Sequence, residues 1–158
     1  MNKNTIPEDF TLALALVDGL PVIFFAINMI IIGIKFKSFL FVFGALLCTF
    51  AGLAKVFWKI IVALKKKNIW FLFIQMRITM PLGFLIILLS LIFNYKRINL
   101  SVVLRFPACV FFLIGIIGMC LMGYFALKLD NSDLKSNWIE QITNTFAQLA
   151  LLIGTLLV

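Results

Sequence analysis

Five long apolar stretches, separated by short basic turns, make up most of this 158-residue chain. They lie at about residues 10–34, 39–64, 69–95, 102–127 and 138–158. A helix needs roughly 20 apolar residues to cross the ~30 Å hydrocarbon core of a bilayer, and each stretch reaches that length. The sequence therefore predicts an all-α integral membrane protein. Residues 1–158 would form a single transmembrane domain, a bundle of five helices joined by short loops.

The composition agrees with a membrane protein. Hydrophobic residues make up 64% of the chain and charged residues 13%, whereas a soluble domain has about half and about a quarter. The formal net charge is +8. Because the basic residues mostly flank apolar stretches, we interpret this charge as anchoring to anionic lipid headgroups, and not as nucleic-acid binding.

The chain offers few groups for redox, metal or hydrolytic chemistry. It has no histidine, the commonest metal ligand. Cys48, Cys109 and Cys120 form no CxxC pair and are typical of small buried hydrophobic residues. Motifs of serine hydrolases, zinc proteases and nucleotide-binding loops are missing from the sequence. We expect no cofactor and no metal site.

The first stretch contains Asp18-Gly19-Leu20-Pro21, for which two interpretations exist. In the first, which we favour, the helix is continuous and kinked at Pro21, and Asp18 is buried beside a partner. In the second, residues 8–17 form a short interfacial segment and Asp18 caps a span that begins near Gly19. The second interpretation leaves four complete spans and a broken first segment.

The second stretch has two distinct faces at about 100° per residue. Small and basic residues share one narrow arc: Gly44, Cys48, Ala51, Lys55, Lys59 and Lys66. Bulky apolar residues lie opposite: Val42, Leu46, Phe50, Leu53, Phe57, Ile60, Ile61 and Leu64. Small residues allow helices to approach closely, so the first face is predicted to contact the bundle and the second to contact lipid.

The fifth stretch carries a polar line at helical spacing. Glu140, Asn144, Gln148 and Thr155 form this line, and Ile142, Phe146, Leu149, Ile153 and Leu156 lie opposite. Asn137, followed three residues later by Glu140, matches a capping box and predicts that the helix starts near Trp138. The polar face is expected to point into the bundle.

Alternating spans place five charged residues in the same half of the bilayer. They are Asp18, Lys55, Lys59, Arg77 and Glu140. Burying each charge alone costs several kcal/mol, so the acids Asp18 and Glu140 are expected to pair with bases. Two acids and three bases leave one cation in excess. The sequence thus predicts an anion- or lipid-binding site.

The predicted site has three basic residues that would bind the anion or lipid, Lys55, Lys59 and Arg77. Its pocket would be lined by the polar residues Gln75, Asn144 and Gln148.

A different interpretation remains open for the same residues. Trp58 and Trp70 are typical of the aromatic belt at the membrane surface. If Trp58 marks that surface, Lys55 reaches toward the headgroups and Lys59 already lies among them. Glu140 would then serve only to cap its helix.

The sequence suggests three functions, in decreasing order of preference. The first is binding of an anionic lipid headgroup or a small organic or phosphate anion, in transport, flipping or lipid-dependent assembly. The second is a non-catalytic subunit or regulator of a larger membrane complex. The third is a lipid-modifying enzyme with Asp18 or Glu140 as its base.

We expect a plasma-membrane location, a cytoplasmic N-terminus and membrane lipids as partners, with a protein partner or a homo-oligomer as the alternative. Nucleic acid is not an expected partner.

Overall fold

A computed structural model describes residues 11–129 and 133–158, and expectations that concern residues 1–10 or 130–132 lie outside these ranges. The described residues contain helices and turns but no strand. The elements are α1 (Leu12–Phe36), α2 (Phe39–Lys65), α3 (Trp70–Ile74), α4 (Met76–Phe93), η1 (Tyr95–Arg97), α5 (Leu100–Val103), α6 (Ala108–Lys128) and α7 (Leu134–Leu156). The fold is all-helical, as the sequence predicts.

Four helices are long and apolar enough to cross a membrane. They cover Leu12–Phe36, Phe39–Lys65, Trp70–Phe93 (which joins α3 to α4) and Ala108–Phe125. The fifth long helix, α7, has 23 residues but carries many polar side chains along its length. That polar face explains why α7 is less hydrophobic than the other four helices.

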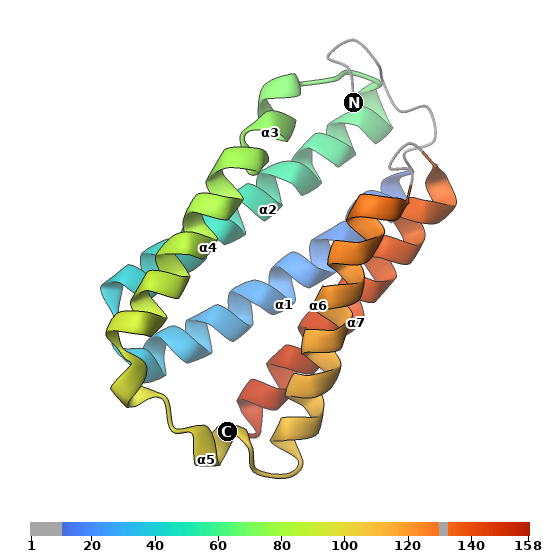
Figure 1. Ribbon diagram of the computed structural model, residues 1–158. Coiled ribbons are helices and arrows are strands. Elements are labelled where there is room, and N and C mark those ends of the chain that lie inside the picture. The colour runs from blue at the N-terminus through green and yellow to red at the C-terminus, as the bar shows by residue number, and fades with distance from the viewer. Residues whose placement is uncertain (1–10, 130–132) are drawn as a thin grey trace.

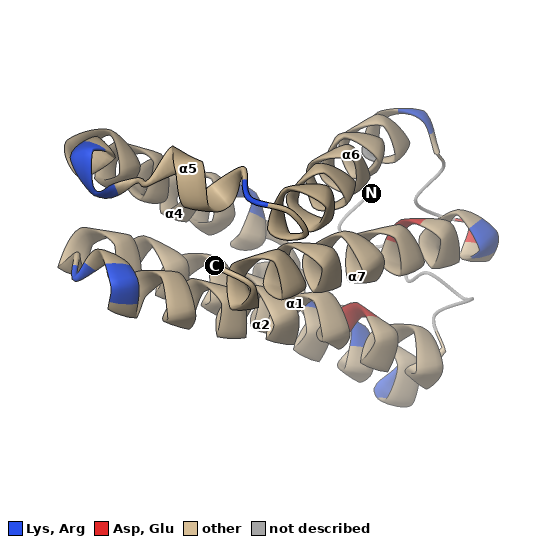
Figure 2. Cartoon of the chain, turned by 90° about the horizontal axis from the view of Figure 1, so that it is seen from below, with Lys and Arg blue, Asp and Glu red and all other residues tan. Residues whose placement is uncertain are grey.

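The helices form two layers (Figure 1). Helix α1 packs between α2 and α7, while α4 packs on α2 and α6 packs on α7. Seen from below, α4 and α6 lie on the same side of the α2–α1–α7 layer and diverge from each other (Figure 2). The arrangement therefore consists of two helix pairs, α2–α4 and α6–α7, joined through α1.

Helix α1 is continuous through Pro21. Its N-cap is Thr11, whose Oγ1 accepts a hydrogen bond of 3.2 Å from the backbone N of Leu14. Asp18 is therefore inside the helix and buried, and it is not a cap. The favoured interpretation is confirmed in that the helix is continuous and Asp18 is buried beside a partner, and the broken first segment is wrong for Leu12–Phe36.

Three helix boundaries differ from the predicted ones. Helix α7 starts at Leu134, because Asp133 accepts a 2.9 Å hydrogen bond from the backbone N of Ser136 and so caps the helix. The predicted capping box is wrong, since Asn137 lies inside α7 and its Nδ2 donates to the carbonyl of Asp133.

The other two differences concern the third and fourth stretches. The third is divided into α3 and α4 at Gln75. The fourth is divided into α5 and α6, because the residue before Pro107 is disfavoured in a helix and proline has no N–H to donate.

The two faces of α2 are confirmed. Gly44, Cys48, Ala51 and Lys59 are buried, and Lys55 is half-buried. The predicted lipid face is exposed at Val42, Leu46, Phe50, Leu53, Phe57 and Leu64, whereas Ile60 and Ile61 of that face are half-buried. Lys66 departs from its predicted face: it ends α2 with a positive φ of 49° and is exposed.

Glycines set the close packing of both helix pairs. A Cβ on Gly83 of α4 would lie 2.8 Å from the carbonyl oxygen of Gly44 on α2. A Cβ on Gly118 of α6 would lie 2.6 Å from the Cβ of Ala147 on α7. Because no side chain fits at either glycine, the paired helices approach almost backbone to backbone.

The inward polar face of α7 is also confirmed. Glu140, Gln148 and Thr155 are buried, whereas Ile142 and Phe146 on the opposite face are exposed. Trp58 corrects the belt interpretation, because its indole is 1% exposed and packs with Leu14 and Val62. Its Nε1 donates a 3.0 Å hydrogen bond to Asn68. Trp58 therefore belongs to the core of the bundle.

Candidate functional site

A buried ion pair joins α1 to α2. The Nζ of Lys59 lies 3.0 Å from the Oδ2 of Asp18, and the two side chains are only 3% and 5% exposed. Gly19, next to Asp18 on α1, faces Val56 of α2, since a Cβ on Gly19 would lie 3.8 Å from the Val56 side chain, an ordinary van der Waals contact. Lys59 is therefore held inside the bundle by its counter-charge and does not reach toward the headgroups.

Two further charges belong to the same region. Lys55 lies one turn before Lys59 on α2, and Glu140 is buried on α7. Glu140 lies within electrostatic range of Lys55, Lys59 and Asp18, but within the described residues it forms no ion pair and its Oε1 accepts no hydrogen bond. We call these four residues the ion cluster. It contains two acids and two bases, so its formal charges cancel.

Arg77 is separate from the ion cluster. Its side chain is exposed, and its guanidinium carbon lies 5.3 Å from the centre of the Phe73 ring, a cation–π contact. Alternation of the spans predicts the level of Arg77 in the membrane but not which helix it faces. Arg77 lines a cavity, and among the described residues no ion pair joins it to Asp18.

This cavity has a volume of about 610 Å³ and connects the two helix pairs. It is lined by Pro21, Val22 and Phe25 of α1, Cys48 and Gly52 of α2, Met76, Arg77, Met80, Pro81 and Phe84 of α4, Met119 of α6, and Asn144 and Gln148 of α7. Most of these side chains are apolar. Met80, Phe84 and Met119 are exposed, so the cavity reaches the outer surface of the bundle.

The polar groups of the cavity come from opposite walls. Arg77 stands on α4, and the amides of Asn144 and Gln148 stand on α7. The Cys48 thiol is already used, because it donates to the carbonyl of Met80 at 3.6 Å. Arg77 and the two amides are thus the groups that can bind a ligand.

Gln148 is the most constrained of these groups. Its side chain is 8% exposed, and its Nε2 donates to the sulfur of Met119 at 3.4 Å. Its Oε1 is buried and accepts no hydrogen bond from the part of the chain that the structure describes. A buried acceptor without a donor is costly, so this oxygen has unused capacity for a ligand.

Gln75 lies outside the cavity lining. Its Nε2 donates to the carbonyls of Ala51 and Leu72, at 3.4 and 3.2 Å, and so attaches the start of α4 to the middle of α2. Gln75 therefore positions Arg77 from two residues away. Among the predicted site residues, Arg77, Asn144 and Gln148 line the cavity, whereas Lys55, Lys59, Asp18 and Glu140 form the ion cluster.

The cavity lies halfway along the helices. Gly52 is the central residue of α2, which spans Phe39–Lys65, and Phe25 is next to the centre of α1, which spans Leu12–Phe36. Met119 and Asn144 lie equally near the centres of α6 and α7. A ligand held here would be near the middle of any membrane that these helices cross.

Sequence reasoning missed most of the apolar lining. Met80 and Met119 gave no signal, because apolar residues lie on every side of α4 and α6 and the few polar residues show no periodicity that would mark an inward side. Neither carboxylate of the ion cluster lines the cavity, so the site offers one cation and two amides but no acid or base.

Comparison with protein-family models, with curated proteins and with solved structures finds no match.

Proposed function

We propose that this protein is a multi-pass membrane protein that binds an anionic amphiphile in the cavity between the two helix pairs and carries it across the membrane. Arg77 would bind the anionic headgroup, and the apolar walls would hold the hydrocarbon next to it. The observation that carries the proposal is the position of Arg77 on a largely apolar cavity, opposite two amides.

The charges of the site favour an anionic ligand. The ion cluster is neutral by itself, so Arg77 is the cation that remains near the cavity. Within residues 11–129 and 133–158, Arg77 forms no ion pair with a carboxylate. A guanidinium binds phosphate or carboxylate through two parallel hydrogen bonds, and water-poor surroundings strengthen that interaction.

The shape of the site favours an amphiphile over a small soluble anion. Most of the lining that Arg77 shares consists of apolar side chains, among them methionine, phenylalanine and proline, which suit hydrocarbon better than a free inorganic anion. Phe84 is 55% exposed and Met119 is 42% exposed, so acyl chains can leave the cavity sideways into lipid. Flexible methionines suit a ligand whose chains vary.

Transbilayer movement is the role that suits a site at this depth. A lipid headgroup normally stays at the membrane surface, whereas Arg77 is held level with the middle of α2 through Gln75 and Ala51. Polar groups at mid-depth that face a cavity mark pathways for polar cargo. The amides of α7 would replace part of the water that the headgroup loses there.

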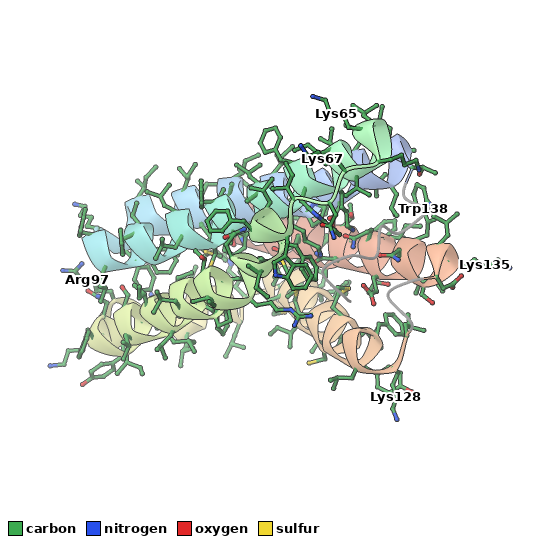
Figure 3. The ribbon with its side chains drawn as sticks, turned by 90° about the horizontal axis from the view of Figure 1, so that it is seen from above. Lys65, Lys67, Arg97, Lys128, Lys135 and Trp138 are labelled. Atoms are coloured by element: carbon green, nitrogen blue, oxygen red, sulfur yellow. The ribbon has the colours of Figure 1, made fainter. Side chains whose placement is uncertain are left out.

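In this proposal α7 is the fifth span, with its polar face turned inward and Phe146 turned toward lipid. Lys65 ends α2 and Lys67 follows it, Lys128 ends α6 and Lys135 lies in the first turn of α7, so these lysines share one end of the bundle. Arg97 follows α4, and in Figure 3 it lies far from Lys128 and Lys135. The lysine-rich end, at which α1 also starts, would be cytoplasmic in a plasma membrane.

The experiment compares Arg77→Gln with Arg105→Gln, which removes an exposed arginine outside the cavity lining. Binding of phosphatidylglycerol and of uncharged phosphatidylcholine is titrated by native mass spectrometry from a neutral detergent. Loss of a hydrogen-bonded charge contact is expected to weaken phosphatidylglycerol binding of Arg77→Gln about 10- to 100-fold. Arg105→Gln should bind like the wild type.

Two results would contradict the proposal. One is unchanged phosphatidylglycerol binding in Arg77→Gln with a folded protein. The other is equal affinity of the wild type for both lipids. A second protein that co-purifies in fixed stoichiometry, together with either result, would favour the alternative role as a subunit of a membrane complex.

A further inference from the structure

We infer that the cavity selects anionic lipids whose headgroup carries a hydroxyl, and that Gln148 is the residue that recognises this hydroxyl. The inference rests on the proposed function, because it concerns the same cavity and names the class of lipid. The ligand would be a phosphodiester lipid with a polyol headgroup. Its phosphate would bind Arg77, and its hydroxyl would donate to the Oε1 of Gln148.

The first support is the hydrogen-bonding state of Gln148. Its Nε2 already donates to Met119, and its Oε1 is a buried acceptor that receives no donor among the described residues. An incoming acceptor, such as a second phosphate oxygen, gains nothing from that oxygen. Once the amide turns toward the cavity, an incoming O–H satisfies this oxygen, so Gln148 favours a ligand with a donor.

The second support is that the polar groups on opposite sides of the cavity belong to different helices. Arg77 has only donors, and it stands on α4. Asn144 and Gln148 stand one turn apart on α7, across the cavity. A ligand that spans both walls needs acceptors at one end and a donor at the other, as a phosphate with a nearby hydroxyl provides.

A third support is that no carboxylate of residues 11–129 or 133–158 lines the cavity. A carboxylate would favour an ammonium headgroup, whereas a neutral amide oxygen accepts from a hydroxyl without needing a positive charge. Glu140 lies two turns from Gln148 on α7, but it belongs to the ion cluster. The cavity is therefore matched to a headgroup with a net negative charge and a neutral donor.

The test uses two lipids of equal charge, phosphatidylglycerol and phosphatidylethanol, which differ in the headgroup hydroxyls. Affinities are measured by native mass spectrometry for the wild type and for Gln148→Leu. The wild type should prefer phosphatidylglycerol about 2- to 10-fold, the value of one net hydrogen bond. Gln148→Leu should bind the two lipids equally and should bind phosphatidylethanol at least as well as the wild type.

Gln141→Leu is the matched control. Gln141 is 2% exposed on the same helix, and its Oε1 also lacks a donor within the described residues, but it does not line the cavity. It should keep the wild-type preference. Gln148→Met, which preserves length and apolar packing beside Met119, serves if the leucine variant does not fold.

The outcomes separate this inference from the proposed function. Equal wild-type binding of both lipids, with both lost in Arg77→Gln, would overturn the inference and leave the proposed function standing. Unchanged binding in Arg77→Gln would overturn the proposed function itself. Soluble glycerol 3-phosphate should compete only weakly, and competition at the affinity of the lipid would overturn the assignment of a lipid as ligand.

Discussion

The ammonium of Lys59 lies 3.0 Å from the carboxylate of Asp18, with both side chains at most 5% exposed. The pair joins the first two helices of the chain inside the bundle. Together with Lys55 and Glu140 it forms a neutral group of charges from three helices. The ion cluster therefore explains four of the five charges in this part of the protein and leaves Arg77 for the cavity.

Breaking this pair on one side is expected to be strongly destabilising. Lys59→Met leaves the Asp18 carboxylate buried without its counter-charge, which costs about 3–5 kcal/mol in comparable cases. The double variant Asp18→Leu/Lys59→Met removes both charges and should lose much less than the two single variants combined. Unfolding in detergent, followed by circular dichroism during titration with sodium dodecyl sulfate, measures all three. Strictly additive losses would show that the two residues do not interact.

Gly83 provides a second prediction, about the α2–α4 pair. A Cβ at this position would lie 2.8 Å from the carbonyl oxygen of Gly44 and 3.0 Å from the backbone N of Cys48. Because backbone atoms cannot move aside, Gly83→Ala should cost about 1–3 kcal/mol through overpacking. It should also shift α4 and so weaken lipid binding at Arg77.

Gly123 is the control for Gly83, since a Cβ there would meet no atom within 4 Å. Gly123→Ala should be neutral or should stabilise α6 by about 0.5–1 kcal/mol, because alanine has less backbone entropy to lose than glycine. Thermal denaturation in the same detergent compares the two variants. Equal effects of both substitutions would mean that close packing at Gly83 is not what holds the pair together.

Asp133 links the stability of α7 to pH. Hydrogen bonds from the backbone N and the hydroxyl of Ser136 lower the pKa of the Asp133 carboxyl below its ordinary value of 3.8. A lowered pKa means that the cap stabilises the folded state fully above the pKa of the unfolded chain. That contribution is lost as the pH falls through the folded pKa.

Two variants of Asp133 test this linkage. Asp133→Asn keeps a good N-cap without a titrating group, so it should remove the loss of stability below about pH 4. Asp133→Ala should lower the stability of α7 at neutral pH as well. Unfolding between pH 3 and pH 7 compares both with the wild type, and an identical acid profile for wild type and Asp133→Asn would refute the linkage.

Much of the fold follows from local sequence. The face of α2 that contacts the bundle was predictable because small residues and lysines recur at helical spacing. Asp18 was predictable as a buried partner because an isolated acid in an apolar stretch needs a counter-charge. The start of α7 was not, since Asp133 and Asn137 are both good N-caps and only the backbone conformation distinguishes them.

The composition of the cavity could not be predicted in the same way. Helix alternation gives the depth of Arg77, but its lateral direction depends on the glycines that join α4 to α2. The contribution of Met119 depends on Gly115 and Gly118, which fix how α6 turns against α7. These are contacts between distant parts of the chain, and an evenly apolar helix carries no periodic signal for them.

Photocrosslinking inside the cavity tests the central claim most directly. Phosphatidylglycerol with a diazirine on an acyl chain is incorporated with the protein into nanodiscs and activated, and the labelled residues are identified by mass spectrometry. Labelling is predicted at Met80, Phe84 and Met119, and it should disappear there in Arg77→Gln. Labelling spread evenly over lipid-facing residues such as Phe50 and Phe146, and unchanged in Arg77→Gln, would contradict an anionic lipid site in this cavity.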